Sequence, residues 1–249
     1  MKDFTLEVCI DTLESARNAI AGGANRLELC AALVIGGTSA SPTLFRQIRR
    51  ESDIKIHAMV RPRFGDFLYT DAEMEQMLDE VAMWRQLGAE GIVSGILTVD
   101  GRLDIPRMQQ LRKAAGDNMN FTLHRAFDVA SDAMQALEDA GKAGVDAILS
   151  SGQQPEAPLG TALLKAMVNN SKGIHIMPGG GIDAESIAQV REETGATSFH
   201  LSGNICGESP MCFRRPEIYM GIPGMSEFER WECSADIIAA ARRVLEEAA

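Results

Sequence analysis

Eight short apolar runs alternate with eight stretches of helical periodicity in this sequence, and the alternation predicts an α/β protein with a parallel sheet. The chain has 249 residues, which is enough for the strands to close into a single (β/α)8 barrel of the TIM type. A doubly wound open sheet would need a glycine-rich turn after the first strand, where this chain has CIDTLES. We therefore predict one barrel domain over residues 1–249.

The predicted strands are short apolar runs, and several of them alternate strictly with polar residues. Such a period of two is typical of strands whose two faces meet different surroundings. The predicted strands cover residues 4–10, 26–30, 54–61, 91–97, 120–127, 147–152, 174–179 and 198–203.

The predicted helices carry apolar residues at three- and four-residue steps. In the stretch 72–87, for example, Met77, Val81 and Trp84 line one face, as in a helix that packs on a core. Gly88 then follows as a typical helix end. The predicted helices cover about 12–21, 43–51, 72–87, 105–115, 131–142, 160–170, 183–193 and 235–248.

One stretch, residues 204–234, fits neither pattern and is rich in glycine, proline and methionine. It is predicted to be a long irregular excursion between the eighth strand and the eighth helix. In a barrel, that connection lies on the face where sites are built.

Composition excludes several classes of partner. The formal net charge is −11, which is unsuited to nucleic acid because phosphate backbones attract basic surfaces. No run approaches the roughly 20 apolar residues of a membrane helix, and the N-terminal MKDFTLEVC carries charge too early for a signal peptide. We therefore expect a cytoplasmic protein with neither a nucleic-acid nor a membrane partner.

Two glutamates lie inside predicted strands, each two residues before a cysteine. Glu7 and Cys9 alternate with aliphatic residues in the first strand, and Glu28 and Cys30 do so in the second. Since the aliphatic face of a barrel strand packs on the helices, we expect all four side chains to point into the barrel.

Further polar residues stand at the ends of other predicted strands, where barrel sites lie. Arg61 ends the third strand, His124 and Arg125 the fifth, and His200 the eighth. A buried glutamate must be paired or become neutral, and Arg61, Arg125 and His124 are the expected partners. We predict a catalytic site of six residues: Glu7, Glu28, Arg61, His124, Arg125 and His200. A purely structural ion-pair network is the alternative.

The two histidines at strand ends differ from the other two in the chain. His124 and His200 are placed for acid–base chemistry near neutral pH, whereas His57 and His175 lie earlier in their strands and are expected to be structural.

A glycine turn follows the seventh predicted strand. Gly179, Gly180 and Gly181 precede a helix, and the loops after strands seven and eight often hold phosphate in barrels. Ser202 and Gly203 would complete this anion site. The alternative is that the glycines only allow a tight turn.

The sequence lacks the motifs of several common enzyme and nucleotide-binding sites. No predicted strand ends in lysine, which disfavours a Schiff-base aldolase, and the HExxH and GxxxxGK[ST] motifs are absent from the sequence. We expect no organic cofactor.

The five cysteines form no CxxC pair, and in a reducing compartment they are expected to be thiols. Cys9 and Cys30 come from consecutive strands, so two inward thiols could share one soft ion such as Cu(I). Ordinary packing is the alternative. Cys206 and Cys212 follow the last strand, and we expect them to pack rather than bind metal.

Several long motifs in this chain are those of a known family. The string LEVCIDTLESARNAIAGGANRLELCAAL, then VRPRFGDFLYTDAE, FTLHRAFD, IMPGGGI and FHLSG, resembles the CutC family from about residue 4 to residue 203. The resemblance implies a cytoplasmic barrel, often a homodimer, that takes part in copper homeostasis. It further implies Cu(I) binding at Cys9 and Cys30.

Two functions therefore remain open. The resemblance favours a Cu(I)-binding protein of copper homeostasis. The polar strand ends and the glycine turn favour a barrel enzyme that acts by acid–base chemistry on a small anionic, phosphorylated metabolite.

Overall fold

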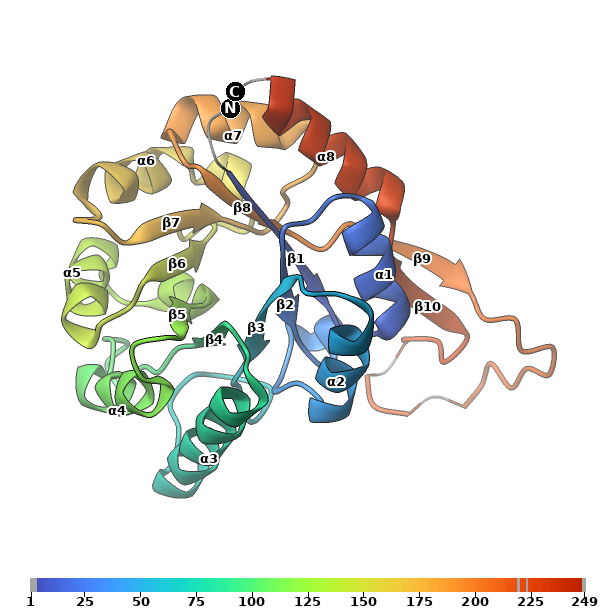
Figure 1. Ribbon diagram of the computed structural model, residues 1–249, viewed down its shortest axis with the longest axis horizontal. Helices are drawn as coiled ribbons and strands as arrows, with labels where there is room; N and C mark the ends of the chain where they lie inside the picture. The colour runs from blue at the N-terminus through green and yellow to red at the C-terminus, as the bar shows by residue number, and fades with distance from the viewer. Residues whose placement is uncertain (1–3, 219, 223, 248–249) are drawn as a thin grey trace.

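A computed structural model describes residues 4–218, 220–222 and 224–247 of the chain. Its main sheet has eight parallel strands in the order β7-β6-β5-β4-β3-β2-β1-β8, surrounded by helices (Figure 1). The strands are β1 (Thr5–Ile10), β2 (Arg26–Leu29), β3 (Lys55–Met59), β4 (Gly91–Ser94), β5 (Asn120–Leu123), β6 (Ala147–Ser150), β7 (His175–Pro178) and β8 (Ser198–Leu201).

The two ends of this sheet meet and nearly close a barrel. β8 pairs with β1 over four residues, and a single parallel bridge between Gly179 and His200 joins it to β7. The predicted (β/α)8 barrel is confirmed, and the open doubly wound sheet is excluded by this closure. All eight predicted strands are present, each shorter than predicted by one to four residues.

Helices follow the strands in the predicted order and cover the outside of the barrel (Figure 1). In the described part of the chain they are α1 (Leu13–Ala21), α2 (Pro42–Glu51), α3 (Asp71–Leu87), α4 (Ile105–Ala115), α5 (Ala133–Ala143), α6 (Thr161–Asn170), α7 (Ser186–Thr194) and α8 (Ala235–Glu247). Short 3-10 helices lie in the connections at Leu33–Ile35, Arg125–Val129 and Ala157–Leu159. Residue 248, the last of the predicted final helix, lies outside the described residues.

Local sequence explains where these helices begin and end. Thr70 and Glu73 form a capping box that satisfies the first amides of α3, and Gly88 ends the helix at a φ of +81°. α7 begins at Ser186 rather than at the predicted residue 183. The carboxylate of Asp183 accepts from the amides of Glu185 and Ser186, which holds the preceding residues in a turn.

The alternation in the strands separates two environments. Leu6, Val8 and Ile10 are buried in the large apolar cluster between barrel and helices. Glu7 and Cys9, on the other face of the same strand, are also buried but lie among the barrel-interior residues. The predicted inward direction of the glutamates and cysteines is therefore what brings polar groups together at the site.

The excursion after β8 contains regular structure that the sequence pattern did not predict. β9 (Asn204–Glu208) and β10 (Glu229–Cys233) pair antiparallel and extend away from the barrel (Figure 1). Ile205 and Trp231 are half exposed on this ribbon. The prediction of an irregular segment was wrong here, because the two strands are short and buried too little to show a clear period of two.

None of the helices in residues 4–218, 220–222 and 224–247 combines the length and the apolar character that a membrane crossing requires.

The buried histidine of β3 makes folding sensitive to acid. Burial, followed by the charge of Arg26, lowers the pKa of His57 to about 4. The unfolded chain therefore takes up the proton first as the pH falls, so stability is lost between about pH 6.5 and about pH 4, by up to about 3 kcal/mol. We expect urea unfolding at a series of pH values to show this loss in the wild type. In His57→Gln, the free energy of unfolding should fall less steeply as the pH is lowered from about 6.5 to about 4. Equal slopes in the two proteins would contradict it.

Candidate functional site

A cavity of about 320 Å³ opens at the C-terminal ends of the strands. That volume is near the lower end for small-molecule sites. Its walls combine thiol, carboxyl, imidazole and guanidinium groups with apolar side chains and glycine backbone. The lining residues are Cys9, Glu28, Leu33, Gly36, Met59, Phe67, His124, Arg125, Leu149, Gly180, Gly181, Ile182, His200, Leu201 and Ser202.

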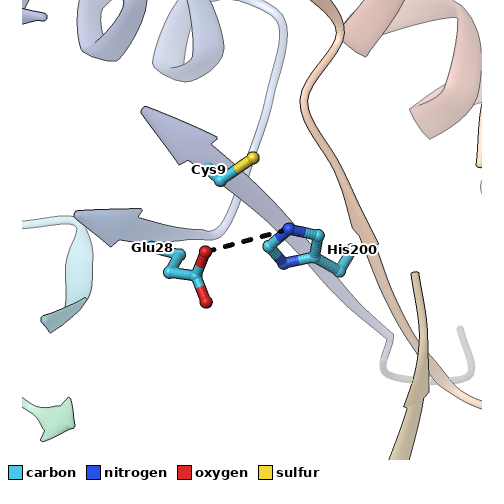
Figure 2. A group of neighbouring side chains, drawn as sticks. All are labelled: Cys9, Glu28 and His200. Atoms are coloured by element: carbon cyan, nitrogen blue, oxygen red, sulfur yellow. Dashed lines mark ion pairs between the residues drawn. The ribbon is translucent and has the colours of Figure 1, made fainter. Parts of the chain in front are cut away.

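Three buried side chains meet on one wall of this cavity. Cys9 from β1, Glu28 from β2 and His200 from β8 are neighbours (Figure 2), and one ligating atom of each lies within 4.8 Å of the others. His200 Nε2 lies 3.9 Å from Glu28 Oε2. A thiol, a carboxyl and an imidazole at this spacing can bind a metal ion or move protons.

Below this group, Glu7 is fully buried and doubly partnered. Its Oε2 accepts from Arg26 Nε at 2.5 Å, and its Oε1 lies 2.8 Å from His200 Nδ1. Burial by itself would raise the pKa of Glu7, but Arg26 and His200 hold it well below its usual range. Glu7 is therefore a fixed negative charge that orients His200.

The predicted partners of the glutamates were wrong. Arg26, not Arg61 or Arg125, pairs with Glu7, because the register of β1 and β2 sets Arg26 directly beside it. A signal for this was present in the sequence: in RLEL, arginine stands two residues before Glu28 and so shares its face.

Arg61 does not pair with the glutamates, contrary to our expectation. Its Nη1 donates to the carbonyls of Gly36 and Gly37, and its Nη2 donates to the carbonyl of Gly65 at 3.0 Å. The guanidinium also lies 5.1 Å from the ring centre of Phe67. Arg61 lies beyond the end of β3, so its side chain reaches the loops instead of the glutamates and holds them in place.

The pKa values of Glu28 and His200 are raised, whereas that of Glu7 is lowered. Burial raises the pKa of Glu28, whose Oε2 accepts from the Cys30 thiol at 3.3 Å and whose Oε1 has no partner within the described chain. Burial would lower the pKa of His200, but Glu28 and Cys9, followed by Glu7, raise it well above its ordinary value. His200 is thus an imidazolium between two carboxyl groups.

The two cysteines of the predicted metal site lie at different heights. The parallel register pairs Cys9 with Glu28, so Cys30 stands two residues further along its strand. The group of mutually close ligating atoms accordingly contains Cys9 but not Cys30. Burial, followed by Glu28, raises the pKa of Cys30 well above its ordinary value.

His124 lies on a part of the cavity wall formed with Phe67. Its Nδ1 accepts from the amide of Ala126 at 3.1 Å, and its ring centre is 4.8 Å from that of Phe67. Burial, followed by the charge of Arg61, lowers its pKa to about 3. The imidazole is therefore neutral at physiological pH, which does not fit the acid–base role predicted from sequence.

Arg125 is oriented by a carboxylate that the sequence analysis did not single out. Asp128 accepts from Arg125 Nε at 2.7 Å, and the hydroxyls of Ser150 and Ser151 also donate to it. Arg125 Nη2 donates to Ser151 Oγ at 2.7 Å. The signal for this network was the pair of strand ends HRAFD and SSG, which carry polar residues on adjacent strands.

The predicted anion site is only partly at the cavity. Gly180, Gly181 and Ser202 line it, whereas the amide of Gly179 donates to the carbonyl of Ser150 and Gly203 is close to Ile238. Within the described residues, the amides of Gly181 and Ser202 donate no hydrogen bond. The amide of Gly180, which also lines the cavity, likewise donates none within these residues.

Cys206 and Cys212 lie away from the cavity and are exposed on the excursion. Our expectation that they pack rather than bind metal was wrong as to packing, because both are exposed on a segment that extends from the barrel (Figure 1).

The pair of Glu7 and Arg26 should behave as a buried ion pair. Glu7→Gln leaves the charge of Arg26 uncompensated, so we expect a loss of about 3–5 kcal/mol in the free energy of unfolding. The double variant Glu7→Gln/Arg26→Gln should recover part of it. Urea unfolding of the two single variants and the double variant measures the coupling, and additive losses would show that the pair does not act as a unit.

Comparison with known proteins identifies a family. The model of the CutC family matches residues 4–205. A CutC family protein of Vibrio campbellii is 41% identical over 236 residues, which cover 94% of this chain and 96% of the relative. A protein of Mus musculus named copper homeostasis protein cutC homolog is 41% identical over 219 residues, 88% of this chain and 80% of the relative.

Solved structures agree with the fold. A copper homeostasis protein CutC of Streptococcus agalactiae has a TM-score of 0.74 at 29% identity, covering 79% of this chain and 97% of its own. Thiamine phosphate pyrophosphorylase of Pyrococcus furiosus, at 18% identity and a TM-score of 0.59, covers 98% of this chain and 96% of its own and shares the fold alone. By the extent of the family match and the identity to its relatives, this protein belongs to the CutC family.

Proposed function

We propose that this protein binds Cu(I) at the cavity wall formed by Cys9, Glu28 and His200, here called the thiol wall. We further propose that it serves copper homeostasis, the process for which its relative in Mus musculus is named. The observation that carries the proposal is the buried group of Cys9, Glu28 and His200. Donors on one ion at bonds of about 2.0–2.3 Å lie up to about 4.6 Å apart, close to the spacing of these atoms.

Cys30 lies outside this close group but in contact with Glu28, and we assign it as the second thiol. Its Sγ is 3.3 Å from Glu28, which belongs to the group, and both thiols are buried. Thiolate and imidazole are ligands that Cu(I) prefers over carboxylate. We therefore assign Cys9, Cys30 and His200 as the ligands, with Glu28 as the acceptor for the proton that Cys30 releases.

The proposal further includes a cytoplasmic location and a homodimeric assembly. The five cysteines support the location, because all are free and thiols persist in reducing compartments. The oligomeric state is tested by sedimentation with and without copper.

We expect wild type to hold one equivalent of Cu(I) in anaerobic competition with a chelator. Cys9→Ser and Cys30→Ser should each lower the affinity by more than the 10–100-fold that is typical of losing an outer partner of a metal site. Affinity should rise with pH, because the raised pKa values of Cys30 and His200 make metal and proton compete. Cys206→Ser, at an exposed thiol, is the control. Equal affinity in all four proteins would refute the proposal.

A second candidate function, an acid–base enzyme on a small anionic and phosphorylated metabolite, is favoured by a different observation. The cavity is far larger than an ion, and its wall at Gly181, Ser202 and Arg125 carries hydrogen-bond donors with no role in the thiol group. Glu28 and His200 would move protons, and these donors would hold the anion.

Inorganic phosphate tests this second candidate. We expect crystals soaked in phosphate to hold an anion at the amides of Gly181 and Ser202, and Arg125→Gln to weaken phosphate binding about tenfold or more, since a charged hydrogen bond is lost. Arg17→Gln, on the exposed face of α1, is the matched control. The candidate function fails if calorimetry detects no phosphate binding in wild type.

A further inference from the structure

The neutral imidazole of His124 is a hydrogen-bond donor that nothing in the described chain uses. Because Nδ1 accepts from the amide of Ala126, the proton of the neutral ring is on Nε2. This Nε2 is buried without a partner, and the side chain lines the cavity while only 4% of the residue is exposed. A buried donor without a partner is costly, so a ligand or water must complete it.

The surroundings of His124 keep this donor uncharged and fixed in direction. The cation of Arg61 opposes protonation, and the ring of Phe67 lies against the imidazole. Gly95 leaves the space that the ring occupies, because a Cβ at this position would come within 2.8 Å of it. An uncharged N–H in such a place suits an oxygen that carries partial or developing negative charge, such as that of a carbonyl or carboxylate.

A second set of donors lies on the same cavity, at the loops that follow β7 and β8. The amides of Gly181 and Ser202 are free within the described residues, and Arg125 Nη1 likewise donates to no group there. Gly180 has a φ of +92° and no side chain, and a Cβ there would lie 3.0 Å from Arg125 Nη1. The glycine therefore lets the guanidinium approach the loop, and Asp128 and Ser151 hold it in that orientation.

We propose that the cavity takes a small organic phosphate that also carries a carbonyl or carboxylate oxygen. Its phosphate is held by the amides of Gly181 and Ser202 with Arg125, and its second oxygen accepts from Nε2 of His124. This inference rests on the second candidate function, since it specifies the substrate class of the same site. The cavity of about 320 Å³ is large enough for such a ligand.

The proposed ligand makes no contact with the thiols of Cys9 and Cys30. Glu28, whose Oε1 also lacks a partner in the described chain, lines the same cavity and is a titratable group that could exchange a proton with the ligand. Apolar side chains, among them Met59, Leu149 and Ile182, also line the cavity and suit a short carbon chain.

2-Phosphoglycolate, which joins a phosphate to a carboxylate through one carbon, is the probe that tests the proposal. Calorimetry on metal-free full-length protein with a copper chelator present compares it with inorganic phosphate. We expect 2-phosphoglycolate to bind at least about tenfold more tightly, since one further hydrogen bond to a charged oxygen is formed.

His124→Phe removes the donor and keeps an aromatic ring against Phe67. It should cancel the tenfold advantage of 2-phosphoglycolate and leave the affinity for phosphate within about twofold. His175→Phe, the same replacement at an exposed residue that begins β7, should change neither affinity.

A measurement on wild type covers the case in which His124→Phe does not fold. Nitrogen-15 NMR of the histidine rings should show His124 as the neutral Nε2–H tautomer at pH 7, with its signal shifted by 2-phosphoglycolate and not by phosphate. An imidazolium, or an Nε2 signal that 2-phosphoglycolate leaves in place, overturns the proposal.

The outcomes separate this inference from the function on which it rests. Equal affinities for the two probes overturn the role of His124 and leave the anion site standing. Failure of both probes to bind overturns the inference and the second candidate function together. Since copper is chelated throughout, neither result depends on the Cu(I) proposal.

Discussion

The charge of Glu7 inside the barrel is the constraint on which the site depends. A fully buried carboxylate is stable only with partners, and here they are Arg26 from the next strand and His200 from the last. These contacts link β8, β1 and β2 across the barrel interior. His200 also takes part in the bridge to Gly179 that joins β8 to β7, so one residue serves both the closure of the barrel and its polar interior.

The fixed charge of Glu7 determines how the groups above it behave. Because Glu7 holds Nδ1 of His200, the other ring nitrogen, Nε2, is directed toward Glu28 and Cys9. The imidazolium partly offsets the burial of Glu28, and Cys30 donates to the same carboxyl group. A soft ion or a proton entering the cavity would therefore meet a set of coupled groups, in which a change at one side chain alters its neighbours.

Another part of the cavity lining has the opposite character. There the donors are the neutral ring of His124, the backbone amides of the glycine loop and the guanidinium of Arg125, none of which exchanges a proton near neutral pH. The cavity thus has one wall suited to metal and proton chemistry and another suited to holding oxygen atoms. The two proposed functions share Glu28 and His200 but otherwise use different groups, so a metal and an anion could occupy the cavity together or compete for it.

Much of the fold was predictable from the sequence, because it depends on local patterns. The alternation of aliphatic residues in FTLEVCI and RLELC and the three- and four-residue steps of α3 reflect which faces are buried, and burial dominates folding energetics. The same alternation placed Glu7, Cys9, Glu28 and His200 at the cavity or just below it. The strands β9 and β10 were missed because their side chains are mostly exposed and leave no such pattern.

Which groups touch was decided only by the tertiary structure. The stagger between the neighbouring strands β1 and β2 sets Glu7 beside Arg26. The same stagger sets Cys9 beside Glu28 and not beside Cys30. No single strand encodes this stagger. The neutrality of His124 likewise depends on Arg61 and Phe67, which come from other parts of the chain. The sequence by itself determined which residues face the interior, and the closure of the barrel determined their partners and charges.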